Sequence, residues 1–288
     1  MKVGLSTYSL SRAIRAGKMD VLGAIRWIAE NGGEFVELSP SGYDLTDNPE
    51  LVKSVVKEAA SAGIDIASYT IGANFIQETE EAYEKEIERV MRQVDIAGAL
   101  GVTRMRHDAG NRPVPENTIE NLEKDLPKLA DACRRVADHA KQYGITTSVE
   151  NHGYHMQGSE RVQRLILAVD RDNFRTTMDI GNFLCVDEDP VSAVKNNVSF
   201  ASMIHFKDFY IRDESRGMGE EGWFQSSHGR RLRGAIVGHG DIDIPAVLKV
   251  IKDSGYDGYI SIEFEGMEDC ELGSRIGMAN VKRIWNEL

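Results

Sequence analysis

Eight short runs rich in β-forming residues recur along the chain, and segments with helical periodicity lie between them. The strand-like runs are Val3–Tyr8, Phe35–Leu38, Asp65–Tyr69, Thr103–His107, Thr146–Glu150, Arg175–Asp179, Ser202–His205 and Tyr259–Glu263. The helical patterns cover Asp20–Glu30, Asn48–Ala62, Glu78–Leu100, Asn117–Gln142, Ser159–Val169 and Asp243–Asp253. This α/β alternation favours a single (β/α)8 barrel of the TIM kind over residues 1–288, with a doubly wound sheet as the alternative.

The connections before and after the strand-like runs differ. Those that enter the strands are short and contain glycine, as at Gly63, Gly101 and Gly144, where glycine can end a helix. Those that leave the strands are longer and more polar, and the longest is a loop insertion at 209–241 after the seventh strand. Functional residues of such barrels lie on the loops that follow the strands. We therefore expect the insertion to cover the barrel mouth or to cross to a neighbouring subunit.

Composition restricts the classes of partner. The chain has 34 basic and 46 acidic residues, a net charge of −12, and this charge would repel nucleic acid and anionic membranes. The N-terminal segment lacks the apolar core of a signal peptide, and no later run approaches a membrane span. The three cysteines show no paired spacing, so no disulfide framework is expected. We expect a cytoplasmic protein with no nucleic-acid or membrane partner.

Four of the strand-like runs end in an apolar residue followed by a residue able to bind metal. These pairs are Val149-Glu150, Met178-Asp179, Ile204-His205 and Ile262-Glu263. Side chains alternate along a strand, so each polar member should face the barrel axis. Three carboxylates in one place would repel each other unless a cation lay among them. Three oxygens and one nitrogen suit a divalent ion, with Mn²⁺ preferred and Mg²⁺, Co²⁺ or Zn²⁺ also compatible.

Each of these residues also has an ordinary structural explanation. Asp179 can cap the turn that follows it, and a strand-end glutamate can pair with a basic side chain. A lone histidine is more often hydrogen-bonded than metal-bound. Glu265 shares the inward phase of Glu263 and is an alternative ligand. The recurrence of the pattern on consecutive strands supports the metal hypothesis.

The segments SVENHG, TTMDIGN, MIHFKD, GHGDIDI and GYDGYISIEFEG resemble those of the xylose-isomerase-like TIM barrels. That superfamily contains sugar phosphate isomerases and epimerases, ketose 3-epimerases, inosose dehydratases and endonuclease-IV-type nucleases. The resemblance implies that Glu150, Asp179, His205 and Glu263 hold the metal. It also implies that Glu150 and Glu263 act as acid and base. Asp243 is expected to be a helix N-cap rather than a catalytic group.

A divalent ion that holds a ketone and its neighbouring hydroxyl makes the adjacent C–H acidic and stabilises an enediolate. Return of the proton gives an epimer or an isomer, and loss of a hydroxyl gives a dehydration product. We expect a metal-dependent isomerase or epimerase acting on a small-molecule sugar or cyclitol. The alternative is a lyase or dehydratase on a keto-sugar or inosose, including cleavage of a 3-keto glycoside. An endonuclease and a non-catalytic sugar-binding barrel are distant alternatives.

Asn182 departs from the ketose 3-epimerase pattern, which has histidine three residues after the aspartate; asparagine can bind a substrate oxygen but cannot supply a proton. Residues at the strand ends and in the following loops are candidates for substrate contact: Tyr8, His107, His152, Asn182, Lys207 and Arg212. Lys207 could also neutralise Asp208 or Glu263. Glu37 and Tyr69 are further candidates, with core packing as the ordinary explanation. We expect a homo-oligomer, either a dimer or a tetramer.

Overall fold

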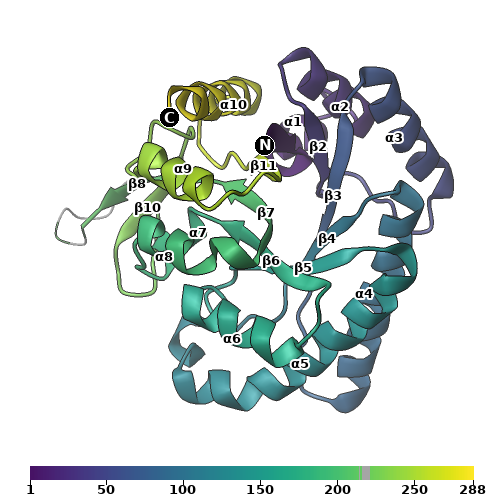
Figure 1. Cartoon of the computed structure of the whole chain (residues 1–288), viewed down its shortest axis with the longest axis vertical. Helices are drawn as coiled ribbons and strands as arrows, with labels where there is room; N and C mark the ends of the chain where they lie inside the picture. The colour runs from purple at the N-terminus through teal and green to yellow at the C-terminus, as the bar shows by residue number, and fades with distance from the viewer. Residues whose placement is uncertain (214, 216–220) are drawn as a thin grey trace.

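Eight parallel strands form a closed barrel in the computed structural model, which describes residues 1–213, 215 and 221–288 (Figure 1). The barrel strands are β1 (Lys2–Ser6), β2 (Phe35–Leu38), β3 (Asp65–Ile71), β4 (Arg104–His107), β5 (Thr146–Glu150), β6 (Phe174–Asp179), β7 (Ala201–Phe206) and β11 (Tyr259–Ile262). Their order around the barrel is β1-β11-β7-β6-β5-β4-β3-β2. The predicted (β/α)8 barrel is confirmed, and the closed sheet excludes the doubly wound alternative.

Helices form an outer ring around the strands (Figure 1). They are α1 (Ser11–Arg15), α2 (Val21–Glu30), α3 (Pro49–Ala62), α4 (Glu80–Leu100), α5 (Ile119–Ala140), α6 (Ser159–Val169), α7 (Asn182–Cys185), α8 (Pro190–Asn197), α9 (Ile244–Asp253) and α10 (Cys270–Glu287). Of these, α2, α3, α4, α5, α6 and α9 match the predicted helical patterns. Within the described residues, no helix is long and apolar enough to cross a membrane.

No helix was predicted over the residues of α10, because small residues take the place of large apolar ones on its buried face. Gly273 and Gly277 both lie on that face. A Cβ atom at Gly273 would lie 2.5 Å from the ring of Phe264, and one at Gly277 would lie 3.2 Å from Ile262. Helix α10 therefore packs very close to the barrel, but its sequence has a weak hydrophobic period.

Local signals set the helix ends. The Thr118 and Asp243 side chains accept hydrogen bonds from backbone N–H groups in the first turns of α5 and α9, which confirms the predicted N-cap role of Asp243. Gly63, Gly101 and Gly144 have φ values of 71°, 73° and 67° and lie just before β3, β4 and β5. Glycine adopts this left-handed conformation without strain, so the chain can leave the helix and enter the next strand within a few residues.

The predicted insertion at 209–241 contains a small antiparallel sheet rather than only a loop. Its strands are β8 (Asp208–Arg212), β9 (Phe224–Gln225) and β10 (Arg231–Ala235), in the order β8-β10-β9. We call these strands and the turn 226–230 the excursion sheet, and it projects from the barrel at the left of Figure 1. Residues 214 and 216–220 of the insertion lie outside the described part of the chain.

Hydrogen bonds fix the excursion sheet to loops at the barrel mouth. The Tyr154 hydroxyl, in the loop after β5, donates to the carbonyl of Gln225 at 3.0 Å. Asp187, in the loop after β6, accepts from the Ser226 hydroxyl at 2.7 Å and from the His228 backbone N–H at 2.9 Å. The described part of the insertion therefore lies against the mouth of its own barrel, while contact with a second subunit stays a prediction.

Candidate metal centre and active site

Glu150, Asp179, His205 and Glu263 come together at the end of the barrel where the strands finish. Each offers one ligand atom, and these atoms all lie within 4.8 Å of one another. We call these four residues the quartet. They stand at the ends of β5, β6, β7 and β11, which are consecutive in the barrel order. The quartet is almost completely buried, with exposed fractions between 0% and 6%.

The alternation of side chains along the strands explains why the quartet converges. The apolar residues that precede its members are fully buried in the hydrophobic core: Val149, Met178, Ile204 and Ile262. An apolar residue directed at the helices places the next side chain on the inner face of the barrel. The same two-residue step on four adjacent strands therefore brings four polar groups to one place.

Asp179 uses its two oxygens differently. Oδ1 accepts hydrogen bonds from the backbone N–H groups of Gly181 at 2.7 Å and Asn182 at 3.0 Å, so the expected turn-capping contact is present. Oδ2 is buried and makes no hydrogen bond to any described residue. Burial raises the pKa of Asp179 above its usual value. Capping fixes the orientation of this carboxylate and leaves one oxygen available as a ligand.

The His205 ring is oriented by a buried carboxylate. Its Nε2 lies 2.9 Å from Glu37 Oε1, and Glu37 also accepts a hydrogen bond from the Thr70 hydroxyl at 2.6 Å. The other ring nitrogen, Nδ1, lies 3.4 Å from Glu263 Oε1 and 3.7 Å from Glu150 Oε2. Carboxylate–histidine pairs of this kind orient histidines that bind metals. Glu37 is 0% exposed and holds the His205 ring in place.

The residues present fit a divalent metal ion. His205 Nδ1 and Asp179 Oδ2 are buried atoms without hydrogen bonds to the described residues, and both belong to the quartet. Groups of this kind are costly unless something binds them. Carboxylate oxygens with one imidazole nitrogen match the preferences of Mn²⁺ and Mg²⁺, and also accommodate Co²⁺ or Zn²⁺.

Lys207 places a buried positive charge beside the quartet. Its Nζ lies 3.1 Å from Glu265 Oε1, 3.3 Å from Glu263 Oε2 and 3.6 Å from Asp179 Oδ2. Burial alone would lower the pKa of Lys207, but the surrounding carboxylates hold it well above its usual value, so the ammonium stays charged. Of the two partners expected for Lys207, Glu263 is the one that it contacts.

Arg106 is a site residue that the sequence analysis missed. Its Nε lies 2.5 Å from Glu150 Oε2, and its Nη2 lies 2.9 Å from Asp108 Oδ1. On this strand, His107 was the residue expected to contact substrate. Met105-Arg106, however, shows the same apolar-to-polar step as the strands that carry the quartet. Applied to β4, that step would have identified Arg106 as the inward residue.

The two glutamates of the quartet have different surroundings. Glu150 accepts a hydrogen bond from Asn182 Nδ2 at 2.9 Å, in addition to its contact with Arg106. Burial would raise the pKa of Glu150, but Arg106 and His205 hold it well below the usual value. Burial raises the pKa of Glu263 to about 7, although His205 and Lys207 oppose the increase. Glu150 therefore stays ionised, while Glu263 can gain or lose a proton near neutral pH.

Four of the predicted candidates for substrate contact lie around the quartet. Asn182 and Lys207 contact its members directly. His152 is half-exposed, and its Nδ1 lies 3.1 Å from Asp108 Oδ1; burial would lower its pKa, but Asp108 raises it overall. Burial, followed by the charge of Glu265, raises the pKa of Tyr8 to about 12, and both residues line one cavity.

The structure corrects the expectation for His107. The side chain is 0% exposed, and its ring packs against Phe75 and Phe174 with centroid separations of 5.8 and 6.1 Å. Because Arg106 occupies the inward position on β4, the next side chain points toward the helices. Tyr69 is likewise a packing residue, and its hydroxyl donates to Gln93 Oε1 at 2.5 Å.

Arg212 lies on the excursion sheet, and its described contacts are with other residues of the insertion. Its Nη1 lies 3.5 Å from Asp241 Oδ2, and its guanidinium lies 5.8 Å from the centre of the Trp223 ring. None of these contacts is with the quartet. The expected role of Arg212 in substrate binding stays a prediction.

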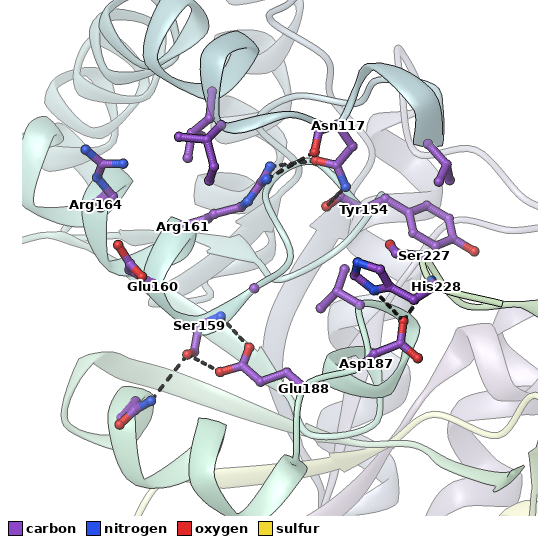
Figure 2. A pocket seen from close by; sticks show the side chains of 16 residues that line it. Asn117, Tyr154, Ser159, Glu160, Arg161, Arg164, Asp187, Glu188, Ser227 and His228 are labelled. Atoms are coloured by element: carbon purple, nitrogen blue, oxygen red, sulfur yellow. Dashed lines mark hydrogen bonds and ion pairs between the residues drawn. The ribbon is translucent and has the colours of Figure 1, made fainter. Parts of the chain in front are cut away.

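A cavity of about 670 Å³ lies beside the mouth, between α6, the loop after β6 and the turn 226–230 (Figure 2). Polar pairs occupy its sides: Ser159 N–H donates to Glu188 Oε2 at 2.8 Å, and His228 Nδ1 lies 2.9 Å from Asp187 Oδ2. Its lining includes no member of the quartet. The buried atoms suited to a metal lie instead in the quartet.

Comparison with known proteins agrees with this architecture. A curated inosose dehydratase of Lacticaseibacillus casei is 24% identical over 270 residues, which cover 79% of this chain and 88% of that protein. A probable 3-DHS dehydratase of Bacillus anthracis superposes with a TM-score of 0.76 at 16% identity over 98% of this chain and 99% of that one. A D-psicose 3-epimerase of Clostridium cellulolyticum superposes with a TM-score of 0.76 at 14% identity over 99% of each chain.

The family model described as the xylose isomerase-like TIM barrel matches residues 25–284. This match includes the quartet, Arg106 and Lys207. The chain therefore belongs to the xylose isomerase-like TIM barrel family.

Proposed function

We propose that this chain is a divalent-metal-dependent enzyme that removes a proton from a carbon next to a carbonyl group of a small sugar or cyclitol. The convergence of Glu150, Asp179, His205 and Glu263 within 4.8 Å is the observation that carries this proposal. A metal held by these residues would polarise the carbonyl and make the neighbouring C–H more acidic. Mn²⁺ is our preferred ion, and Mg²⁺, Co²⁺ and Zn²⁺ are alternatives.

We assign different roles to the two glutamates. Glu263 is the proposed base, because its described ion-pair contacts are with Lys207 and His205 and none of them is with an arginine. Glu150 is the proposed anionic ligand, kept ionised by Arg106. Lys207 would stabilise negative charge that develops on the carbonyl oxygen, and Asn182 would orient a substrate hydroxyl.

This asymmetry favours dehydration over epimerisation. An epimerase of this kind needs one carboxylate on each face of the substrate, and each must gain and lose a proton. Glu150 is paired with Arg106 Nε at 2.5 Å, so it would have to leave this partner before it could carry a proton. With a single base, the remaining outcomes are transfer of the proton to the adjacent carbon and loss of a neighbouring hydroxyl. The similarity to inosose dehydratases supports the second, so we propose a dehydratase for a keto-cyclitol or keto-sugar.

Loss of a hydroxyl requires a proton for the departing oxygen. His152 is the proposed donor because it is half-exposed at the mouth, lies near Glu150 in the chain and has a raised pKa. In the proposed elimination, Glu263 takes the proton from the carbon next to the carbonyl. A carbon–carbon double bond then forms as the bond between the neighbouring carbon and its hydroxyl oxygen breaks. The hydroxyl leaves as water with the proton from His152.

Isomerase or epimerase activity is the second candidate. Glu263 and Glu150 stand at the ends of β11 and β5, with β7 and β6 between them in the barrel order, so a substrate could bind between the two carboxylates. A substrate bound there would meet one carboxylate on each side. Proton return by Glu150 would then require this residue to release Arg106.

The test is to incubate the Mn²⁺-loaded protein in deuterated water with inosose and, separately, with D-fructose. A dehydratase would form an inosose product lighter by one water, which mass spectrometry detects. An isomerase or epimerase would instead produce another sugar carrying deuterium. Chelator-treated protein is the control. Absence of both dehydration and deuterium incorporation, with metal content verified, would reject the proposed activity on these substrates.

A further inference from the structure

We propose that a second cavity beside the quartet binds an uncharged sugar ring in addition to the ring that reacts. The cavity has a volume of about 440 Å³ and lies between the start of α1, the segment after β11 and the excursion sheet. The inference rests on the proposed function, because it assigns the size and class of the substrate at the same site. The expected substrate is a glycoside or disaccharide derivative.

The cavity adjoins the reaction site through shared residues. Tyr8 and Glu265 line it. Glu265 also lies 3.1 Å from Lys207 Nζ, and the same Nζ lies 3.3 Å from Glu263. A ligand extending from the quartet past Lys207 would therefore enter this cavity. One ring would lie at Glu263, and a second ring would lie beyond Glu265.

Close backbone contacts fix the side of the cavity formed by the excursion sheet. A Cβ atom at Gly234 would lie 2.3 Å from the carbonyl oxygen of Glu265, so β10 lies directly against the segment after β11. Gly222, with φ of 88°, approaches Met267 so closely that a Cβ atom would lie 2.5 Å from its sulfur. Larger side chains at these glycines would force the two segments apart and open the cavity.

The lining suits an uncharged sugar ring. Tyr8 and Phe224 supply aromatic surface for the apolar faces of a sugar, and Glu265 supplies a carboxylate that can accept hydrogen bonds from hydroxyl groups. The Phe224 ring is held against Phe209 at a centroid separation of 5.5 Å.

The arginines of the cavity donate to neutral acceptors, so a sugar phosphate is the ligand that competes with an uncharged ring. Arg12 donates to the carbonyls of Met267 at 3.4 Å and Glu268 at 2.5 Å, and its guanidinium lies 5.7 Å from the centre of the Phe264 ring. Arg15 donates to the Ser41 hydroxyl. A phosphate would therefore compete with these contacts and would also meet the charge of Glu265.

Equilibrium binding to the Mn²⁺-loaded protein tests the inference. Isothermal titration would compare glucose and galactose with cellobiose, lactose and maltose. We expect at least one disaccharide to bind about tenfold more tightly than its component sugars. Met267→Trp should abolish this advantage by filling the cavity, without changing the affinity for single sugars. Met267 is 52% exposed, so the substitution should not disturb the core. Leu272→Trp, at a position 44% exposed outside the lining, is the matched control.

Three outcomes would overturn the proposed subsite: no disaccharide binds more tightly than its components, the advantage persists in Met267→Trp, or Leu272→Trp abolishes it equally. Binding of glucose 6-phosphate that is stronger than that of glucose and lost in Met267→Trp would identify an anion site instead. These results are independent of the turnover test. Disaccharide binding without chemistry would reject only the proposed activity, and chemistry without disaccharide discrimination would reject only the subsite.

Discussion

Arg106 Nε lies 2.5 Å from Glu150 Oε2 in the interior of the barrel mouth, where the two side chains are only 8% and 2% exposed. The pair joins the ends of the neighbouring strands β4 and β5. It also distinguishes Glu150 from Glu263, whose nearby cation is Lys207. The difference between the two glutamates in the proposed mechanism follows from this contact.

Replacing Arg106 with methionine should destabilise the protein strongly. Removing one partner of a buried ion pair leaves an uncompensated charge and typically costs about 3–5 kcal/mol. The free energy of unfolding in urea, measured with chelator present, gives the loss. Arg135→Met is the matched control because Arg135 pairs with Glu84 at the surface, where such pairs contribute about 1 kcal/mol or less. Equal losses of unfolding free energy in the two variants would show that the buried Arg106–Glu150 pair stabilises the protein no more than a surface pair does.

Metal binding should depend on His205 but not on His155. Both histidines are 0% exposed, but His155 Nε2 lies 3.0 Å from Asp125, outside the quartet. Mn²⁺ at a hundred times its Kd should raise the free energy of unfolding by about 2.7 kcal/mol in the wild type. His205→Asn should lose this metal-dependent increase, and His155→Asn should keep it. Urea unfolding with and without Mn²⁺ measures the increase, and its retention in His205→Asn would reject the proposed ligand set.

His107 should make the protein sensitive to mild acid. Burial lowers the pKa of His107 to about 4, so below the usual value of about 6.5 the unfolded chain binds a proton that the folded chain excludes. Stability from this group is fully present above pH 6.5 and is lost as the pH falls toward 4, by about 3 kcal/mol in total. His107→Leu should reduce the fall in unfolding free energy between pH 7 and pH 5, as measured by urea titration. If the unfolding free energy of His107→Leu depended on pH as that of the wild type does, His107 would not be the source of the acid sensitivity.

Asp187 should hold the turn 226–230 in place. Its carboxylate accepts from the Ser226 hydroxyl and the His228 N–H, and its φ of 60° can be adopted by glycine without strain. Asp187→Gly should therefore remove the contacts but keep the backbone conformation, and hydrogen exchange at the His228 amide should accelerate by tenfold or more, by our order-of-magnitude estimate. Asp170→Gly, at a φ of 52° at the end of α6, is the control. Unchanged exchange in Asp187→Gly would show that other contacts hold the turn.

The quartet could be predicted because each member has a local signal. In a closed barrel, an apolar residue followed by a polar one at a strand end has a single inward direction, so four separate signals combine into one site. Arg106 follows Met105 and so carries the same signal. His107 was predicted instead because histidine can play many chemical roles, but its side chain faces the helices. Strand phase was therefore a better guide than residue type at β4.

The excursion sheet could not be predicted from local patterns. Its strands pair Arg212 with Arg231 and Tyr210 with Arg233, residues that are distant in the sequence. The arginine run looks like a solvated loop until the pairing places Arg233 4.8 Å from the Tyr210 ring and 5.4 Å from the Trp223 ring. These cation–π contacts stabilise the charge of Arg233, whereas the sequence alone shows only a run of arginines.

Solvent-deuterium exchange by metal-loaded Glu263→Gln tests the central claim most directly, because glutamine keeps the shape of the residue but removes the base. The substrate is inosose in deuterated water with Mn²⁺, and elemental analysis verifies that wild type and variant hold equal metal. The proposed mechanism predicts that the wild type incorporates deuterium next to the carbonyl or releases water, and that Glu263→Gln slows this chemistry by roughly 10²–10⁴-fold. Wild-type rates in the metal-loaded variant would contradict the assignment of Glu263 as the base.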